Sequence, residues 1–166
     1  MNKNYNENVK TMTLKEVKKM YLNDTQNKPK NNTCNNAIIK LIELINNDNK
    51  TITCELTKSG SVLNRGSVVE CLVKLFLTNQ KTTSKYAQGR NDINLNGVGY
   101  EIKYYNSVAY ASLSKKQQQQ YNNKEYKPLI AVDSYGVYIS NTQYYKIAKN
   151  GKISGISKRL GTIVEW

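Results

Sequence analysis

The sequence predicts a protein of the α/β (α+β) class, with a mixed central β-sheet flanked by helices and an N-terminal helical arm. Three observations lead to this prediction. The N-terminal half has segments with helix signals, the C-terminal half has short strand-like runs, and an Asn-Gly dipeptide separates two of those runs. The order helix, hairpin, helix, strand, strand is typical of a core built around a mixed sheet. The length of 166 residues suits one compact domain with an extra arm.

The N-terminal arm is expected over residues 1–60. Residues 1–11 are polar, and we expect them to be disordered. Thr13 can cap a short helix over residues 13–22, because Glu16 follows three residues later. The rest of the arm is predicted to be an Asn/Lys-rich linker, a helix with a broad apolar face and a strand, at residues 23–32, 35–47 and 51–56.

The core is expected over residues 61–166, after a Ser-Gly-Ser connection. Its first helix, over residues 67–77, is apolar nearly all round and is interrupted only by Glu70 and Lys74, so it is predicted to be buried. The later core elements are two strands, a polar helix, two strands, a short helix and a last strand, at residues 91–95, 98–105, 113–123, 128–133, 136–140, 142–149 and 162–166.

The chain is strongly basic, with 25 Lys and Arg residues against 12 Asp and Glu residues and a formal net charge of +13. The electrostatic field of such a charge favours polyanionic partners such as nucleic acid or an anionic membrane surface. Of these we expect nucleic acid, and double-stranded DNA is the expected form. The alternative is a highly soluble surface in a protein with a strong Lys bias, since only three of these cations are Arg. No stretch approaches the ~18 apolar residues that cross a bilayer. We expect a cytoplasmic protein without membrane contact, because the N-terminus lacks the apolar segment of a secretory signal.

The side-chain inventory excludes several kinds of chemistry. The chain has no histidine, so it cannot use the Ser-His-Asp and Cys-His arrangements or histidine-ligated zinc. Any hydrolysis must use carboxylates, lysine, tyrosine and a hard metal ion. Cys34, Cys54 and Cys71 have no CxxC spacing, so they are expected to be buried or incidental thiols.

The Asn-Gly dipeptide at residues 96–97 predicts a two-residue type I′ hairpin turn. Leu95 then pairs with Val98, and the same register places Asp92 directly opposite Glu101. Alternation assigns two faces to the hairpin. The predicted core face carries Ile93, Leu95, Val98, Tyr100, Ile102 and Tyr104, and the other face carries Asp92, Asn94, Gly99, Glu101 and Lys103.

Two carboxylates in directly opposed positions repel each other, because their Cβ atoms lie ~5 Å apart. A divalent cation relieves this repulsion, and Mg²⁺ prefers carboxylate oxygens together with water and substrate phosphate. Lys103 lies on the same face as Glu101 and can stabilise charge on an attacked phosphate. The alternative is a solvated strand face, on which the charges of Asp92, Glu101 and Lys103 need no special role.

Asp92 followed by Glu101-Ile102-Lys103 on the next strand resembles the PD-(D/E)XK nucleases, the restriction-endonuclease-like superfamily. The resemblance covers about residues 66–139, with Asn91 in place of the family's proline. It implies a restriction-endonuclease-like core. It also implies that Asp92, Glu101 and the backbone carbonyl of Ile102 bind Mg²⁺, for which Mn²⁺ can substitute, and that Lys103 is the catalytic lysine.

Glu70 on the first core helix matches an outer acidic residue of the metal site that the resemblance implies. Ser67 and Glu70 also fit a capping box, so a purely structural role for Glu70 stays open. Further candidates for contacts with nucleic acid follow from charge, stacking ability and proximity to the hairpin; they are Arg90, Lys115, Lys116 and Tyr105.

The sequence therefore predicts a metal-dependent endonuclease that hydrolyses phosphodiester bonds, in DNA more than in RNA. The N-terminal arm could add DNA contacts or the surface of a homodimer. An alternative is a nucleic-acid-binding protein of the same fold that cuts nothing and acts on a protein–DNA complex, for example as an anti-defence factor of a phage or mobile element.

Overall fold

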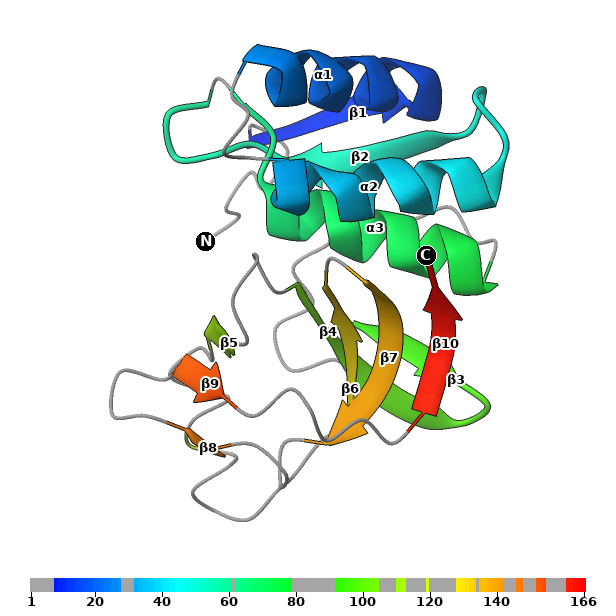
Figure 1. The fold of residues 1–166 in the computed structure, drawn as a ribbon, viewed down its shortest axis with the longest axis vertical. Coiled ribbons are helices and arrows are strands. Elements are labelled where there is room, and N and C mark those ends of the chain that lie inside the picture. Colours follow the sequence, from blue (N-terminus) through cyan, green and yellow to red (C-terminus); the bar gives the residue numbers. More distant parts are fainter. Residues whose placement is uncertain are drawn as a thin grey trace, which may run out of the picture. The chain divides into compact units, whose positions relative to one another are not determined.

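The computed structural model describes residues 8–27, 32–60, 62–78, 92–104, 110–112, 119, 128–133, 135–141, 146–147, 152–154 and 161–166 (Figure 1). The chain divides into two compact units, Met1–Tyr86 and Ala87–Trp166. The sequence had suggested a division at residue 60. The structural division comes later, because the helix that follows residue 60 packs against helical and strand elements of the first unit.

The described part of the first unit combines a two-stranded antiparallel ribbon with three helices. The elements are β1 (Val9–Thr13), α1 (Leu14–Asn27), α2 (Asn32–Ile45), β2 (Thr51–Glu55) and α3 (Arg65–Thr78). The expectation of disorder was wrong for residues 9–11. They form most of β1, whose hydrogen bonds are satisfied by β2 far along the chain, from Val9 opposite Glu55 to Thr13 opposite Thr51.

Helix α1 begins with the capping box that the sequence predicts. The Glu16 backbone N–H donates to Thr13 Oγ1 at 3.2 Å, and the Thr13 N–H and hydroxyl donate to Glu16 Oε1 at 3.4 and 2.9 Å. The helix continues through residues that were expected to form a linker. Asp24, within that stretch, accepts hydrogen bonds from Arg65 at 3.0 Å and from Asn35 at 2.9 Å, so tertiary partners hold this last turn.

The core of the first unit lies between the ribbon and the helices. Leu14, Val17 and Tyr21 form the buried stripe of α1. Helix α2 buries most of its predicted apolar face, including Leu41, but Leu44 is 42% exposed. Helix α3 is buried over most of its length, as its sequence predicts. Cys54 on β2 and Cys71 on α3 are buried thiols, which confirms that expectation for these two residues.

The second unit contains a five-stranded mixed sheet in the order β10-β7-β6-β4-β3. Its strands are β3 (Ile93–Leu95), β4 (Val98–Tyr104), β6 (Pro128–Val132), β7 (Gly136–Asn141) and β10 (Gly161–Glu165). Strands β4 and β6 pair in parallel, and the other neighbours are antiparallel, so the prediction of a mixed sheet is confirmed. The described side chains of β6, residues 129–132, are buried on both faces of the sheet.

A smaller sheet of three strands, in the order β5-β9-β8, completes the second unit. The strands are β5 (Tyr110–Ser112), β8 (Lys146–Ile147) and β9 (Lys152–Ser154). The predicted helix over residues 142–149 was wrong for Lys146 and Ile147, because β9 offers these residues backbone partners. The predicted polar helix over residues 113–123 lies outside the described residues except for Gln119, which is helical.

Candidate functional site

The hairpin formed by β3 and β4 has the predicted turn and register. Leu95 pairs with Val98, Asn94 with Gly99 and Ile93 with Tyr100. Asn96 and Gly97 have φ angles of 51° and 83°, which are the positive values that a type I′ turn requires. Asp92 directly precedes β3, and extension of the same register places it opposite Glu101, as predicted.

The Asp92 carboxylate accepts a backbone hydrogen bond at the end of the β3–β4 pairing. The Ile102 backbone N–H donates a hydrogen bond to Asp92 Oδ2 at 2.8 Å. Ile102 lies beyond the last residue of β4 that pairs with β3, so a side-chain oxygen takes the role that a backbone carbonyl would have in a longer strand. The carbonyl of Ile102 points to the same edge of β4 as its N–H. The Asp92 side chain and the Ile102 carbonyl therefore belong to one short stretch of sheet edge.

Glu101 and Lys103 are both half-buried and point to the face opposite Ile102. Ile102 is only 8% exposed, so the core-facing assignment is confirmed for this residue and for Ile93. It is not confirmed at the hairpin tip, where Val98 is 44% exposed.

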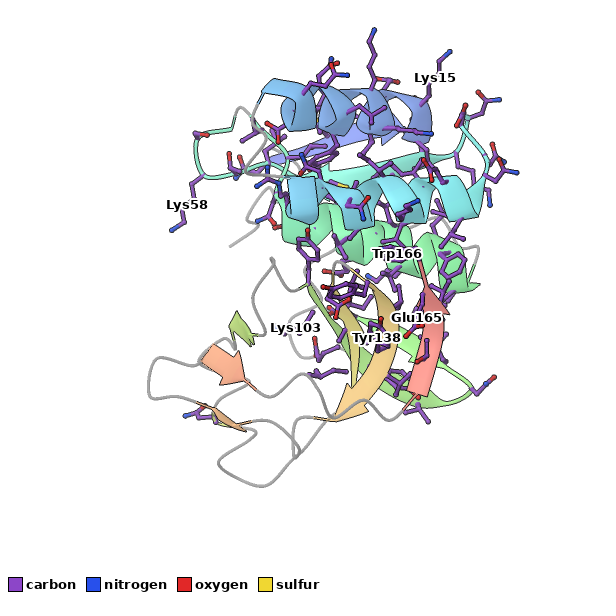
Figure 2. The ribbon with its side chains drawn as sticks, viewed as in Figure 1. Lys15, Lys58, Lys103, Tyr138, Glu165 and Trp166 are labelled. Atoms are coloured by element: carbon purple, nitrogen blue, oxygen red, sulfur yellow. The ribbon has the colours of Figure 1, made fainter. Side chains whose placement is uncertain are left out.

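The face that carries Glu101 and Lys103 is not a uniformly solvated strand face. The parallel register places Lys103 beside Ala131, and the next strand continues this row with Tyr138. Ala131 and Tyr138 are 2% and 1% exposed. Figure 2 shows Lys103 and Tyr138 on strands of the same sheet. Lys103 is therefore a half-buried residue in a row with two buried neighbours, where electrostatic interactions are less screened than in water.

Sequence reasoning missed Tyr138 as a neighbour of the candidate site. A Cβ atom at Gly136 would collide with the Val164 backbone oxygen of β10 and would lie 3.0 Å from the Tyr138 hydroxyl oxygen, so the glycine lets both β10 and the phenol approach. The pattern Gly136-Val137-Tyr138 could have indicated this arrangement, because residues two apart on a strand share a face. The pairing of β7 with β6 was needed to bring that face into line with Lys103.

Glu70 has a different local setting from the one that the capping-box interpretation predicts. Asn64 caps α3, because its Oδ1 accepts a hydrogen bond from the Ser67 N–H at 3.2 Å. The Ser67 hydroxyl instead accepts a bond from the Glu55 N–H at 2.9 Å. Glu70 Oε1 lies 2.9 Å from Lys74 Nζ. The proposed capping box is therefore wrong, and Glu70 forms an ion pair one turn along its own helix.

Four residues that the sequence suggests for contacts with nucleic acid lie outside the described residues. They are Arg90, Tyr105, Lys115 and Lys116. Asn91, at the proline position of the resemblance, also lies outside them. Glu70 belongs to the first unit and the hairpin to the second, and each unit is described by itself.

The carboxylate and carbonyl oxygens at the hairpin suit a hard cation that needs only a few ligands from the protein. Within the described ranges, no group of three or more Asp, Glu, Cys or His side chains is placed to hold a metal ion. Mg²⁺ usually needs fewer, because one or two carboxylates with water and substrate phosphate complete its shell. Asp92 and Glu101, supplemented by the Ile102 carbonyl, can supply the protein share of such a shell.

Comparisons with protein families, curated proteins and solved structures find no match to this chain. Within the part of the chain that the structure describes, no helix is both long and apolar enough to cross a membrane. The functional conclusion therefore depends on the residues of the site themselves.

Proposed function

We propose that this chain is a metal-dependent nuclease with a restriction-endonuclease-like core, which hydrolyses phosphodiester bonds in double-stranded DNA. One observation carries the proposal. The hairpin register sets Asp92 opposite Glu101, the Asp92 carboxylate reaches the Ile102 amide at 2.8 Å, and Lys103 shares a face with Glu101.

Asp92 and Glu101 hold Mg²⁺ or Mn²⁺ in this proposal, and the backbone carbonyl of Ile102 is a third ligand. The bound cation supplies Lewis-acid polarisation of the phosphate and lowers the pKa of a bound water. Asp92 can serve both the fold and the metal, because the Ile102 N–H occupies only one of its two carboxylate oxygens. Glu101 lies on β4, which pairs with β3 on one edge and with β6 on the other.

Lys103 stabilises the negative charge that builds on the phosphate oxygens as water attacks. This interaction is stronger in the transition state than with the bound substrate, so it accelerates the reaction and contributes little to affinity. The half-buried position of Lys103 beside Ala131 favours this role over that of a fully solvated cation. Cations of the remaining surface supply most of the attraction to DNA, since the net charge is +13.

Cleavage of duplex DNA by the full chain tests the proposal, with Mg²⁺ or Mn²⁺ compared with excess EDTA. We expect cutting only with the cation, and no cutting by Asp92→Asn. The Asn side chain keeps an oxygen that can accept from the Ile102 N–H but removes the charge that binds the metal. Lys58→Ala is the matched control, because Lys58 is exposed and lies outside the second unit. A parent protein that cuts neither DNA nor RNA with either cation contradicts the nuclease proposal.

A non-cutting nucleic-acid-binding protein is the second candidate, and one observation favours it. The hydrogen bond from the Ile102 N–H already gives Asp92 a structural role that needs no metal. In this case the chain binds DNA with strong salt dependence, because counterions are released with each phosphate contact, but Mg²⁺ has no effect on its melting temperature. Thermal unfolding with and without Mg²⁺ separates the two candidates even before a substrate is found.

A further inference from the structure

The exposed side of α1 presents a row of basic and amide side chains. Lys15, Lys19, Leu22 and Gln26 follow one another at intervals of three or four residues, so they lie along one face of the helix. An open surface recess of about 300 Å³ lies along this face, and it is lined by Lys15, Lys18, Lys19, Leu22, Asn23, Gln26 and Asp48. Figure 2 shows Lys15 extending outward from α1. We call the four residues Lys15, Lys19, Leu22 and Gln26 the α1 stripe.

The acidic residues of α1 make their side-chain contacts with residues outside the stripe. Glu16 belongs to the capping box with Thr13, and Asp24 forms an ion pair with Arg65 at 3.0 Å. Lys18, at the side of the stripe, pairs with Glu43 at 3.6 Å. Among the described residues, Lys15 and Lys19 take part in no ion pair. Three lysines, Lys15, Lys18 and Lys19, line the recess beside a single acid, Asp48, so the recess keeps a net positive charge for a ligand.

The stability of α1 does not explain why its lysines lie where they do. All three lysines fall in the first two turns of the helix, and the last turn has no basic residue. Cations near a helix N-terminus oppose the helix dipole, and cations near the C-terminus are the stabilising arrangement. Leu22, which is 40% exposed, adds an apolar side chain to the same face. Where the charges on a helix lower its stability, a bound anionic ligand is expected to offset the loss.

We infer that the α1 stripe is a binding surface for the backbone and major groove of double-stranded DNA, separate from the hairpin. Lys15 and Lys19 are one turn apart, about 6 Å along the helix axis, and can contact neighbouring phosphates of one strand. The stripe extends about 16 Å along the helix, which exceeds the ~12 Å width of the major groove. Leu22 and Gln26, beyond the lysines, offer an apolar surface and an amide to base edges.

This inference deepens the proposed function, because it names a surface that binds the same DNA, but it does not depend on cleavage. Its test is therefore a binding measurement in excess EDTA. The full-length double variant Lys15→Gln/Lys19→Gln is compared with the parent on one fixed DNA duplex over a series of salt concentrations. We expect the slope of log affinity against log salt to become shallower by about 2, since each lost phosphate contact removes about 0.9. Between about 50 and about 200 mM salt, the double variant should then lose about tenfold less affinity than the parent.

Lys10→Gln/Lys58→Gln is the matched control. It removes the same charge from two exposed lysines of the same unit, one on β1 and one after β2. We expect its salt slope to stay close to that of the parent. Equal slopes for the two double variants would overturn the inference, because the stripe would then contribute no more than any other lysine pair.

A loss of fold is distinguishable from a loss of contact. Replacement of Lys15 and Lys19 removes cations from the unfavourable end of α1, so the melting temperature should stay level or rise slightly. A changed slope in a protein that never cuts DNA supports the stripe and contradicts the nuclease proposal, so the two ideas fail separately.

Discussion

Helix α3 and the β3–β4 hairpin each carry an acidic residue near a lysine, but their charges are arranged differently. On α3, Glu70 and Lys74 neutralise each other across one helical turn, and Asn64 and Ser67 satisfy backbone groups at the helix start. The polar groups of α3 have partners that explain them as structure. On the hairpin, Asp92 accepts a hydrogen bond from the Ile102 N–H, and extension of the register places it opposite Glu101. Directly opposed carboxylates repel each other, and a bound cation would offset the repulsion.

The comparison predicts that substitutions on the hairpin change chemistry and that substitutions on α3 change only stability. The largest expected effect is that of Lys103→Ala. Metal-dependent cleavage under single-turnover conditions should fall by about 10²-fold or more, by analogy with removal of other groups that stabilise the transition state. DNA affinity should change little. Lys58→Ala removes the same charge elsewhere, and equal cutting by the two variants would reduce Lys103 to surface charge.

The next effect concerns Asp92, whose two roles can be separated by two substitutions. Asp92→Ala leaves the Ile102 N–H without its acceptor and should lower the free energy of unfolding by about 1–3 kcal/mol in EDTA. Asp92→Asn keeps an acceptor and should lose less. Both variants should lose the rise in melting temperature that Mg²⁺ gives the parent. A persistent Mg²⁺ effect in Asp92→Asn would remove Asp92 from the metal site.

A smaller effect is expected at the start of α3. Asn64→Ala removes the helix cap and should cost about 1 kcal/mol in the free energy of unfolding, measured by denaturant titration. Asn64→Asp is the control, because aspartate is an equally good cap. The rate of cleavage at saturating DNA should be the same for both variants. A cleavage defect in Asn64→Ala at a temperature where it is fully folded would mean that α3 also serves the chemistry.

The smallest effect is expected for Glu70→Gln. It weakens an ion pair between neighbouring turns, which is worth about 0.5 kcal/mol. Lys74 already offsets the charge of Glu70, so we expect the Mg²⁺ dependence of cleavage to stay within about twofold of the parent. A higher Mg²⁺ requirement in Glu70→Gln, absent from Lys74→Gln, would instead make Glu70 the outer acidic residue that the family resemblance implies.

Local physical chemistry determined several features that the sequence alone predicts correctly. The Asn-Gly turn needs two residues that accept positive φ, and with the period of two it fixes the hairpin register and the pairing that brings Asp92 toward Glu101. Thr13 and Glu16 cap α1 because their spacing matches the helix start. The apolar sequence of α3 predicts its burial. In the turn and the cap, the interacting groups lie within a few residues of one another, and the burial of α3 follows from its composition.

Tertiary structure decided the features whose partners lie far along the chain. The sequence of β1 is polar, and only its pairing with β2 makes it a strand. Asn64 and Ser67 could each cap α3, and the choice follows from the Glu55 N–H of β2, which engages the Ser67 hydroxyl. The parallel register of β4 and β6 places Lys103 beside the buried Ala131. No local pattern specifies such pairings, because the free energy that fixes them comes from burial and hydrogen bonds between distant segments.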